Sequence, residues 1–292
     1  MNASDFIKTC EVKLSELYSK EESRSLAFRL IEEFAGIDLK TYALNPKQEL
    51  RSEVYNKVYD SLEELSKNRP IQYIIGFEWF LGRKFIVNEN VLIPRPETEE
   101  LVLWASDFIK EKRFSDKITV LDAACGSGII GISLACMVEN ATIWACDKSA
   151  DALEISTINS AIIPNVNIYN TLECDLLNDK ESSSNFNDAS FNMVISNPPY
   201  VKNSEKRFMR ANVLDFEPHI ALFVSDNDPL IFYRKIAKMA MRVLKNGGVL
   251  FFEINESESE RTIECVKNEG FKLVETKEDF RGKIRFLRAI KR

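Results

Sequence analysis

The most distinctive candidates for chemistry in this sequence are Asn197-Pro198-Pro199-Tyr200, which follow an apolar run ending at Val194-Ile195. Two successive prolines remove two backbone N–H donors and stiffen the chain. An amide, two rigid residues and a phenol therefore stand where a predicted buried strand leaves its sheet, and open α/β folds bind ligands at such positions. The alternative is a rigid exit from the strand, with Tyr200 as a packing ring.

A glycine turn is the second candidate for chemistry. In LDAACGSGIIG, Gly126 and Gly128 let the backbone pass close to a ligand, and the next helix directs its free N–H groups to the same place. With Gly131 the spacing also matches G-x-G-x-x-G, the dinucleotide fingerprint, which is a weak signal by itself. The turn therefore predicts a cofactor loop without identifying the cofactor.

Carboxylates at the ends of successive predicted strands narrow the choice of cofactor. Asp122 ends the strand before the glycine turn, Asp147 ends the second strand, and Asp175 follows the third. A carboxylate at Asp147 is suited to accept both ribose hydroxyls of a nucleoside, and three carboxylates favour a cofactor that carries positive charge. The alternative for Asp147 and Asp175 is that they cap the next helix or turn.

The elements that must position these residues follow from the hydrophobic pattern. From about Lys117 onward, apolar strand-like runs alternate with helix-like runs, which predicts a mostly parallel sheet with helices on both faces. The last two strand-like runs, FKLVETKED and KIRFLRAIK, are expected to pair antiparallel. The polar stretch 178–190 is interpreted as a loop before the fourth strand.

The N-terminal part of the chain predicts helices instead. Ser19 and Glu22 form a capping box before an amphipathic run that Gly36 ends. Asn45-Pro46 is expected to open another helix, because proline fits the first helical position. The apolar faces of such helices need cover, which favours a small helical bundle.

Composition and charge exclude several classes of protein. The 292 residues are 45% hydrophobic and 29% charged, as in an ordinary globular chain. The formal net charge of -6 argues against a protein that holds duplex nucleic acid by phosphate neutralisation alone. A single histidine, His219, excludes a His pair or His-metal cluster within one chain.

The spacing of the cysteines and the hydropathy of the chain indicate the cellular compartment that we expect. No two of the six cysteines have CxxC spacing, so neither a zinc site nor a disulfide framework is expected. No secretory signal is recognised, and no apolar run reaches the roughly 18 residues of a membrane span. A reducing cytoplasm is therefore the expected compartment.

The motifs in their order resemble a known class of enzymes. DAACGSG, ACDKS and NPPY resemble the Rossmann-like methyltransferases that use S-adenosylmethionine, and NPPY is similar to the motif of those that methylate an exocyclic or amide NH₂ group. The stretches RPIQYIIGFEWFLGRKFIVNENVLIPRPETEELV, EPHIAL and PLIFYRKIAKMAMRVLKNGGVLFFEI resemble the PrmC/HemK family of protein-(glutamine-N5) methyltransferases. This resemblance runs from about Pro70 to Ile254.

The resemblance implies both a fold and an activity. The fold is an α/β Rossmann-like sheet, mostly parallel with an antiparallel last strand, behind an N-terminal helical domain. The implied domains are a helical substrate-recognition domain (1–72), a β-hairpin linker (73–94) and a methyltransferase domain (95–292). The implied reaction moves a methyl group from S-adenosylmethionine to the amide nitrogen (N5) of the Gly-Gly-Gln glutamine of peptide-chain release factors. A cytoplasmic monomer without nucleic-acid or membrane partners is expected.

The resemblance also implies roles for individual residues. The Asn197 side-chain oxygen and the Pro198 carbonyl would accept the two N–H bonds of the substrate amide, with Tyr200 as a wall. Pro199 joins these three in binding the substrate. No metal is expected. The implied cofactor-binding residues are Ala124, Cys125, Gly126, Ser127, Gly128, Asp147, Asp175, Leu176 and Asn197.

One position departs from the family pattern. Glycine is usual where Ala124 stands, so the cofactor loop is expected to lie slightly farther from the methionine moiety. Binding should survive because Gly126 and Gly128 are intact.

Two other functions remain open. An adenine-N6 or guanine-N2 nucleic-acid methyltransferase also needs two acceptors for an NH₂ group, but it would need a basic recognition surface, and the helical segment is nearly neutral. A non-catalytic cofactor-binding protein could share the fold, but the intact Asn197–Tyr200 motif argues against it.

Overall fold

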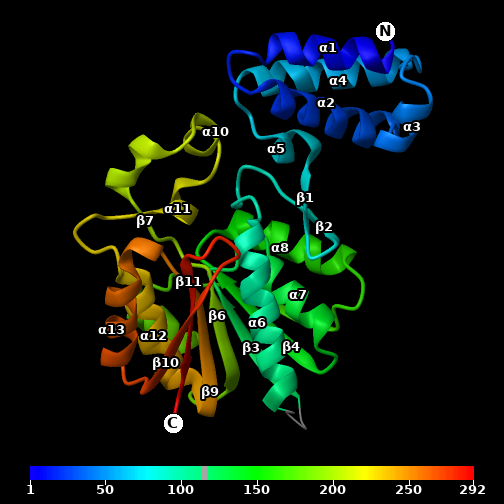
Figure 1. Cartoon of the computed structure of the whole chain (residues 1–292). Helices are drawn as coiled ribbons and strands as arrows, with labels where there is room; N and C mark the ends of the chain where they lie inside the picture. Colours follow the sequence, from blue (N-terminus) through cyan, green and yellow to red (C-terminus); the bar gives the residue numbers. More distant parts are fainter. Residues whose placement is uncertain (113–116) are drawn as a thin grey trace. The chain divides into compact units, whose positions relative to one another are not determined.

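The computed structural model describes residues 1–112 and 117–292. The chain forms two compact units, of which unit 1 contains Met1–Phe77 with Arg210–Phe216, and unit 2 contains Glu78–Met209 with Glu217–Arg292. Unit 1 is helical and unit 2 is built on a β-sheet (Figure 1). Within the described ranges, no helix combines the length and the hydropathy that a bilayer crossing requires.

Unit 1 is helical, and the apolar faces of its helices between Ala3 and Ile75 share one core. The capping box predicted at Ser19 and Glu22 is present at the start of α2, and Gly36 ends that helix with a left-handed φ of 67°. These local signals and the amphipathic pattern therefore predict α2 correctly. The helices of unit 1 are α1 (Ala3–Lys13), α2 (Lys20–Ala35), α3 (Leu39–Leu44), α4 (Ser52–Ser66), α5 (Ile71–Ile75) and α10 (Ala211–Leu214).

The predicted helix start at Asn45-Pro46 is wrong. α4 begins at Ser52, and residues 45–50 form a turn and an extended segment beside the N-terminus. The backbone N–H groups of Ala3 and Ser4 donate to carbonyls of this segment at 3.0 and 2.9 Å. These tertiary hydrogen bonds satisfy backbone groups that a helix would have satisfied locally, so they override the helix-start signal.

Unit 2 contains a seven-stranded sheet in the order β10-β11-β9-β6-β3-β4-β5. Neighbours from β5 to β9 pair in parallel, and β11 pairs antiparallel with both β9 and β10. The expected mostly parallel sheet with an antiparallel last strand is confirmed. The strands are β3 (Ile118–Ala123), β4 (Ala141–Asp147), β5 (Ile168–Glu173), β6 (Phe191–Ser196), β9 (Leu244–Glu253), β10 (Leu273–Glu278) and β11 (Ile284–Ile290).

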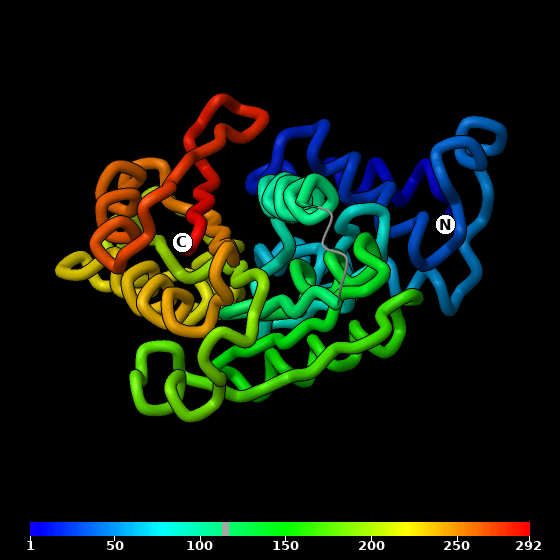
Figure 2. The backbone as a smooth tube through the Cα atoms, turned by 90° about the horizontal axis from the view of Figure 1, so that it is seen from below, coloured from blue at the N-terminus to red at the C-terminus, as the bar shows by residue number. Residues whose placement is uncertain are grey.

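The two faces of this sheet are buried in separate apolar cores. Side chains alternate along a strand, so Val120 and Ile195 pack into one core, whereas Leu121 and Val194 pack into the other. Helices cover both faces, with α12 and α13 on one side of the strands and α6, α7 and α8 on the other (Figures 1 and 2). These helices are α6 (Pro96–Lys112), α7 (Ile129–Met137), α8 (Ala150–Ile162), α12 (Ile231–Val243) and α13 (Ser259–Asn268).

The polar stretch 178–190 was predicted to be a loop, and this prediction is wrong in part, because the stretch contains α9 (Asp179–Asn185). The side chain of Asn178 caps the start of this helix. Arg242 donates to the carbonyls of Ser182 and Phe186 at 2.8 and 2.7 Å. These bonds satisfy carbonyl groups near the C-terminal end of α9. A cationic partner distant in sequence thus stabilises a helix that local composition does not indicate.

Short elements complete unit 2 around the carboxyl ends of the parallel strands. The strands β1 and β2 pair with each other, as expected for the hairpin, and β7 pairs in parallel with β8. These elements are β1 (Phe77–Phe80), β2 (Arg83–Ile86), β7 (Val201–Lys202), β8 (Phe223–Val224), α11 (His219–Leu222) and the 3₁₀ helices η1 (Asn203–Phe208) and η2 (Glu256–Glu258).

Candidate functional site

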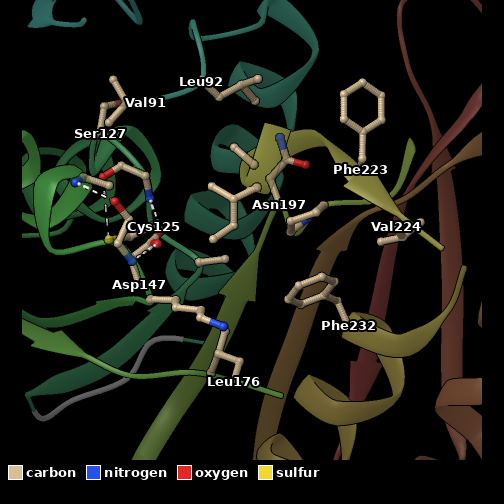
Figure 3. Close-up of a pocket in the computed structure, with 18 of the residues that line it drawn as sticks. Val91, Leu92, Cys125, Ser127, Asp147, Leu176, Asn197, Phe223, Val224 and Phe232 are labelled. Carbon is tan, nitrogen blue, oxygen red and sulfur yellow. Dashed lines mark hydrogen bonds between the residues drawn. The ribbon is translucent and has the colours of Figure 1, made fainter. Parts of the chain in front are cut away.

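A cavity of about 400 Å³ lies in unit 2 and is lined by the loops that follow β3, β4, β5 and β6 (Figure 3). Parallel α/β sheets bind ligands at this carboxyl edge, and the volume is typical of a small-molecule site. Two further segments, 90–98 and 220–232, contribute most of the remaining wall. The position of the cavity agrees with the position predicted from the strand-end motifs.

The loop after β3 forms one wall of the cavity. The backbone N–H of Gly126 donates to Asp147 Oδ2 at 2.9 Å, and the N–H of Cys125 donates to the carbonyl of Cys146 at 3.0 Å. Gly126 has a φ of 53°, which favours glycine. Ala124, Cys125, Gly126 and Ser127 all line the cavity, so the structure brings these four predicted residues together.

Gly128 has a different role from the one predicted. It is not among the lining residues, and a Cβ atom at this position would lie 2.5 Å from Ser156 Oγ and 2.6 Å from the hydroxyl oxygen of Tyr169. Ordinary carbon–oxygen contacts are longer, so a larger residue would push these side chains apart. Gly128 therefore allows the loop to pack closely against α8 and β5 instead of approaching a ligand.

Asp122 does not supply charge to the cavity, so that part of the prediction is wrong. Its side chain is fully buried, and its Oδ2 accepts the backbone N–H of Gly131 at 2.8 Å in the first turn of α7. Burial raises the pKa of Asp122 to about 7. The carboxylate of Asp122 therefore anchors the helix start behind the glycine loop.

Asp147 lines the cavity from the end of β4. Its Oδ1 accepts the N–H of Ser149 at 3.0 Å, and Ser149 itself is the N-cap of α8. Asp147 thus holds the turn before α8, while its other oxygen holds Gly126. Each carboxylate oxygen keeps acceptor capacity for a hydroxyl donor in the cavity. Burial raises the pKa of Asp147, although the backbone donors act in the opposite direction.

Asp175 and Leu176 form a third part of the wall, after β5. Burial works against ionisation of Asp175, but hydrogen bonds from Lys148 Nζ at 2.7 Å and the N–H of Leu177 at 3.0 Å outweigh it and lower the pKa. Lys148 compensates the charge of Asp175. Leu176 is buried and presents an apolar side chain suited to the face of a base.

The Asn197–Tyr200 motif is only partly exposed to the cavity. Asn197 and Pro199 line it, whereas Pro198 and Tyr200 do not. The amide nitrogen of Asn197 donates to Thr98 Oγ1 at 3.2 Å. The hydroxyl of Tyr200 donates to Glu253 Oε1 at 3.1 Å, and burial raises the pKa of Tyr200. The predicted wall function of Tyr200 is not met in this geometry.

A further wall of the cavity is built around an ion pair that sequence reasoning did not predict. Arg95 lines it, and its Nη2 forms an ion pair of 2.7 Å with the buried Glu217. Glu217 also accepts the N–H of Ile93 at 3.2 Å, which fixes the segment before α6. Arg95 lies in the stretch IPRPET and Glu217 in the stretch EPHIAL. Nothing in either stretch indicates that these two side chains will pair, because the fold brings them together. Apolar lining residues of this wall are Val91, Leu92, Ile220, Phe223, Val224 and Phe232.

Comparisons with known proteins identify similar sequences over most of the chain. The PrmC N-terminal domain family matches residues 6–76, and the methyltransferase small domain family matches residues 105–215. The release factor glutamine methyltransferase of Flavobacterium psychrophilum is 39% identical over 282 residues, covering 94% of both chains. That of Bacteroides thetaiotaomicron is 37% identical over 276 residues, covering 94% of this chain and 95% of the other.

A solved structure is similar at a greater distance. Precorrin-6y C5,15-methyltransferase from Geobacter metallireducens is 15% identical to this chain, with a TM-score of 0.45, and the match covers 71% of this chain and 95% of the other.

Backbone strain at Ala124 leads to a stability prediction. Ala124 has a φ of 59°, and the left-handed region costs an alanine about 1–2 kcal/mol relative to glycine. Glycine gains about 0.4–1 kcal/mol of chain entropy in the unfolded state. Ala124→Gly should therefore raise the free energy of unfolding by about 0.5–1 kcal/mol, as measured by urea denaturation.

The neighbouring alanine gives a matched control. Ala123 ends the extended strand β3 and is fully buried, so Ala123→Gly relieves no strain and removes a packed methyl group. It should lower the free energy of unfolding by about 1 kcal/mol. Equal losses from both substitutions would show that Ala124 is not strained.

Proposed function

The chain belongs to the release factor glutamine methyltransferase family, and from that premise we propose that it methylates the glutamine of the Gly-Gly-Gln motif of peptide-chain release factors. The methyl donor is S-adenosylmethionine, and the acceptor is the side-chain amide nitrogen (N5). The observation that carries the proposal is one cavity lined both by a strand-end carboxylate, Asp147, and by the amide of Asn197. Asp147 ends β4 and Asn197 directly follows β6, and these two strands flank β3 in the sheet.

The cavity fits S-adenosylmethionine by the chemistry of its lining. Asp147 keeps acceptor capacity for ribose hydroxyls, Leu176 offers an apolar surface for adenine, and the glycine loop leaves room beside Gly126, where a Cβ would meet nothing within 4 Å. The carboxylate of Asp147 favours a cofactor with positive charge. When bound, this cofactor supplies an electrophilic methyl group on its sulfonium centre.

The role of Asn197 and Pro198 is to orient a weak nucleophile. A primary amide nitrogen shares its lone pair with the carbonyl, the same resonance that flattens a peptide bond. We propose that the Asn197 oxygen and the Pro198 carbonyl accept both N–H bonds of the substrate, which aims the nitrogen and favours the positive charge that develops on it. Orientation of this kind contributes up to roughly 7–11 kcal/mol. No general base is required before the methyl group moves.

The proposal extends to the organisation of the chain. We propose that residues 1–72 recognise the release factor, that 73–94 link the domains and that 95–292 carry out methyl transfer. We also propose a cytoplasmic monomer that binds neither nucleic acid nor membrane. The formal net charge of -6 supports the absence of a nucleic-acid partner. An adenine-N6 or guanine-N2 methyltransferase is therefore the weaker alternative.

A substrate comparison tests the proposed function directly. Labelled S-adenosylmethionine is incubated with the protein and a purified release factor, and in parallel with DNA and with RNA. The label should enter the release factor alone, and mass mapping should place it on the Gly-Gly-Gln glutamine. A release factor in which this glutamine is replaced by alanine serves as the control. Label in nucleic acid would overturn the proposal in favour of the alternative.

Asn197→Ala tests the orienting role. The variant should keep S-adenosylmethionine binding largely intact and lose at least about 100-fold in turnover, or 2.7 kcal/mol, because the substrate amide loses one acceptor. Single-turnover kinetics and calorimetry measure the two effects separately. Asn192→Ala, on β6 and outside the cavity, should leave turnover near normal. Near-normal methylation by Asn197→Ala would refute the role.

Asp147→Ala tests the cofactor site. Because hydrogen bonds to charged groups contribute roughly 1.5–3 kcal/mol each, the dissociation constant for S-adenosylmethionine should rise by about tenfold or more in calorimetry. Asp151→Ala is the matched control, since Asp151 is exposed in the first turn of α8 and does not line the cavity. An unchanged affinity would leave Asp147 with the turn-capping role alone.

A further inference from the structure

We propose that Glu253 and Thr98 are positioning residues that fix the orientation of the Asn197 amide, so that its oxygen faces the substrate. This inference rests on the proposed function, because it explains how the acceptor assigned to Asn197 is presented. We call the hydrogen-bonded series Glu253–Thr98–Asn197 the orienting chain. Neither Glu253 nor Thr98 was singled out by sequence reasoning.

The orienting chain joins three elements around the carboxyl edge of the sheet. Glu253 is the last residue of β9, Thr98 lies in the first turn of α6, and Asn197 directly follows β6. The hydroxyl of Thr98 donates to Glu253 Oε2 at 2.7 Å, and the Asn197 amide nitrogen donates to Thr98 Oγ1 at 3.2 Å. Thr98 is fully buried by relative exposure and Glu253 is 2% exposed, so bulk water does not compete for these bonds.

The direction of the bonds follows from counting hydrogens. A carboxylate has no hydrogen to give, so Thr98 must use its single hydroxyl hydrogen toward Glu253. Thr98 Oγ1 can then only accept in its contact with Asn197, and an acceptor selects the NH₂ end of the amide. The carbonyl oxygen of Asn197 is left to the cavity that this residue lines. An ionised Glu253 therefore determines which end of the amide meets the substrate.

The second carboxylate oxygen of Glu253 helps to hold the Asn197–Tyr200 motif in place. Oε1 accepts the hydroxyl of Tyr200 at 3.1 Å, which ties the last residue of the motif to the same carboxylate. The backbone is held as well, since Asn255 Nδ2 donates to the carbonyl of Tyr200 and the hydroxyl of Tyr233 donates to the carbonyl of Glu253, both at 3.3 Å. This gives Tyr200 a role that does not require it to line the cavity.

The surroundings of Glu253 make its protonation state matter. Burial raises the pKa of Glu253, and the hydrogen bonds from Thr98 and Tyr200 lower it. Of the charged groups nearby, Arg285 on β11 favours the ionised form and Glu97 on α6 disfavours it. If Glu253 takes up a proton, it can donate to Thr98, which reverses the chain and turns the Asn197 oxygen toward Thr98. Activity should thus fall as the pH falls through a pKa above that of an ordinary glutamate.

Substitutions at Thr98 test the orienting chain with closely matched shapes. Thr98→Val removes the hydroxyl and keeps the branched side chain, whereas Thr98→Ser keeps the hydroxyl. We expect Thr98→Val to lower kcat by about tenfold or more, the effect of losing an orienting hydrogen bond. The KM for the release factor and the dissociation constant for S-adenosylmethionine should stay within about twofold. Thr98→Ser should restore most of the lost turnover.

Glu253→Gln tests the charge. The glutamine has nearly the same shape but brings its own N–H donors, so the direction of the chain is no longer enforced. We expect a lower kcat and the loss of the decline at low pH that the unaltered protein shows. Equal losses from Thr98→Val and Thr98→Ser, or a Glu253→Gln enzyme with normal kcat and an unchanged pH profile, would overturn the inference.

A measurement without substrate separates this inference from the proposed function. The side-chain NH₂ signals of Asn197 can be assigned in a ¹⁵N spectrum by their absence in Asn197→Asp. These protons should exchange with solvent faster in Thr98→Val than in the unaltered protein or Thr98→Ser. Identical exchange rates of the Asn197 NH₂ protons in all three proteins would refute the orienting chain, whatever the substrate is. Protected signals in a protein that fails to label release factors would instead support the chain and refute the substrate.

Discussion

The candidate site depends first on the hydrogen bond from the Gly126 N–H to the carboxylate of Asp147. β3 and β4 are parallel neighbours, so their following loops leave the sheet side by side. The bond, together with that from the Cys125 N–H to the Cys146 carbonyl, holds these loops in one arrangement. The carboxylate is thereby placed in the cavity wall before any ligand is present, and little ordering remains to be done on binding.

Much of this architecture could be predicted because it is encoded locally. The alternation of apolar strands and amphipathic helices indicates a parallel sheet, and parallel strands bring their carboxyl ends to one edge whatever the details of the loops. The helix α2 was predicted correctly from its capping box and its terminal glycine, since both signals act within a few residues. Placing Asn197 and Asp147 in one cavity needed only strand order, not loop conformation.

The features that sequence reasoning missed depend on partners distant along the chain. Pro46 has the composition of a helix start, but its carbonyl is bound by an N-terminal N–H group. α9 is polar and short, yet Arg242 binds its terminal carbonyls. Gly128 was interpreted as a ligand-facing glycine, although it faces Ser156 and Tyr169. In each case the local sequence has the expected preference, but tertiary contacts determine the structure that forms.

The acidic residues near the cavity show why residue type alone does not define a role. Asp122 is buried against the start of α7, Asp147 joins two loops and faces the cavity, and Asp175 is compensated by Lys148. Glu253 receives two hydroxyl hydrogens and forms no ion pair with another described residue, so it imposes a direction on the bonds around it. A carboxylate acts through the donors that reach it. Two hydroxyls make Glu253 an orienting group, whereas a lysine makes Asp175 part of a nearly neutral wall. The functional difference between these carboxylates therefore lies in the donors that reach each of them, and only the folded chain supplies those donors.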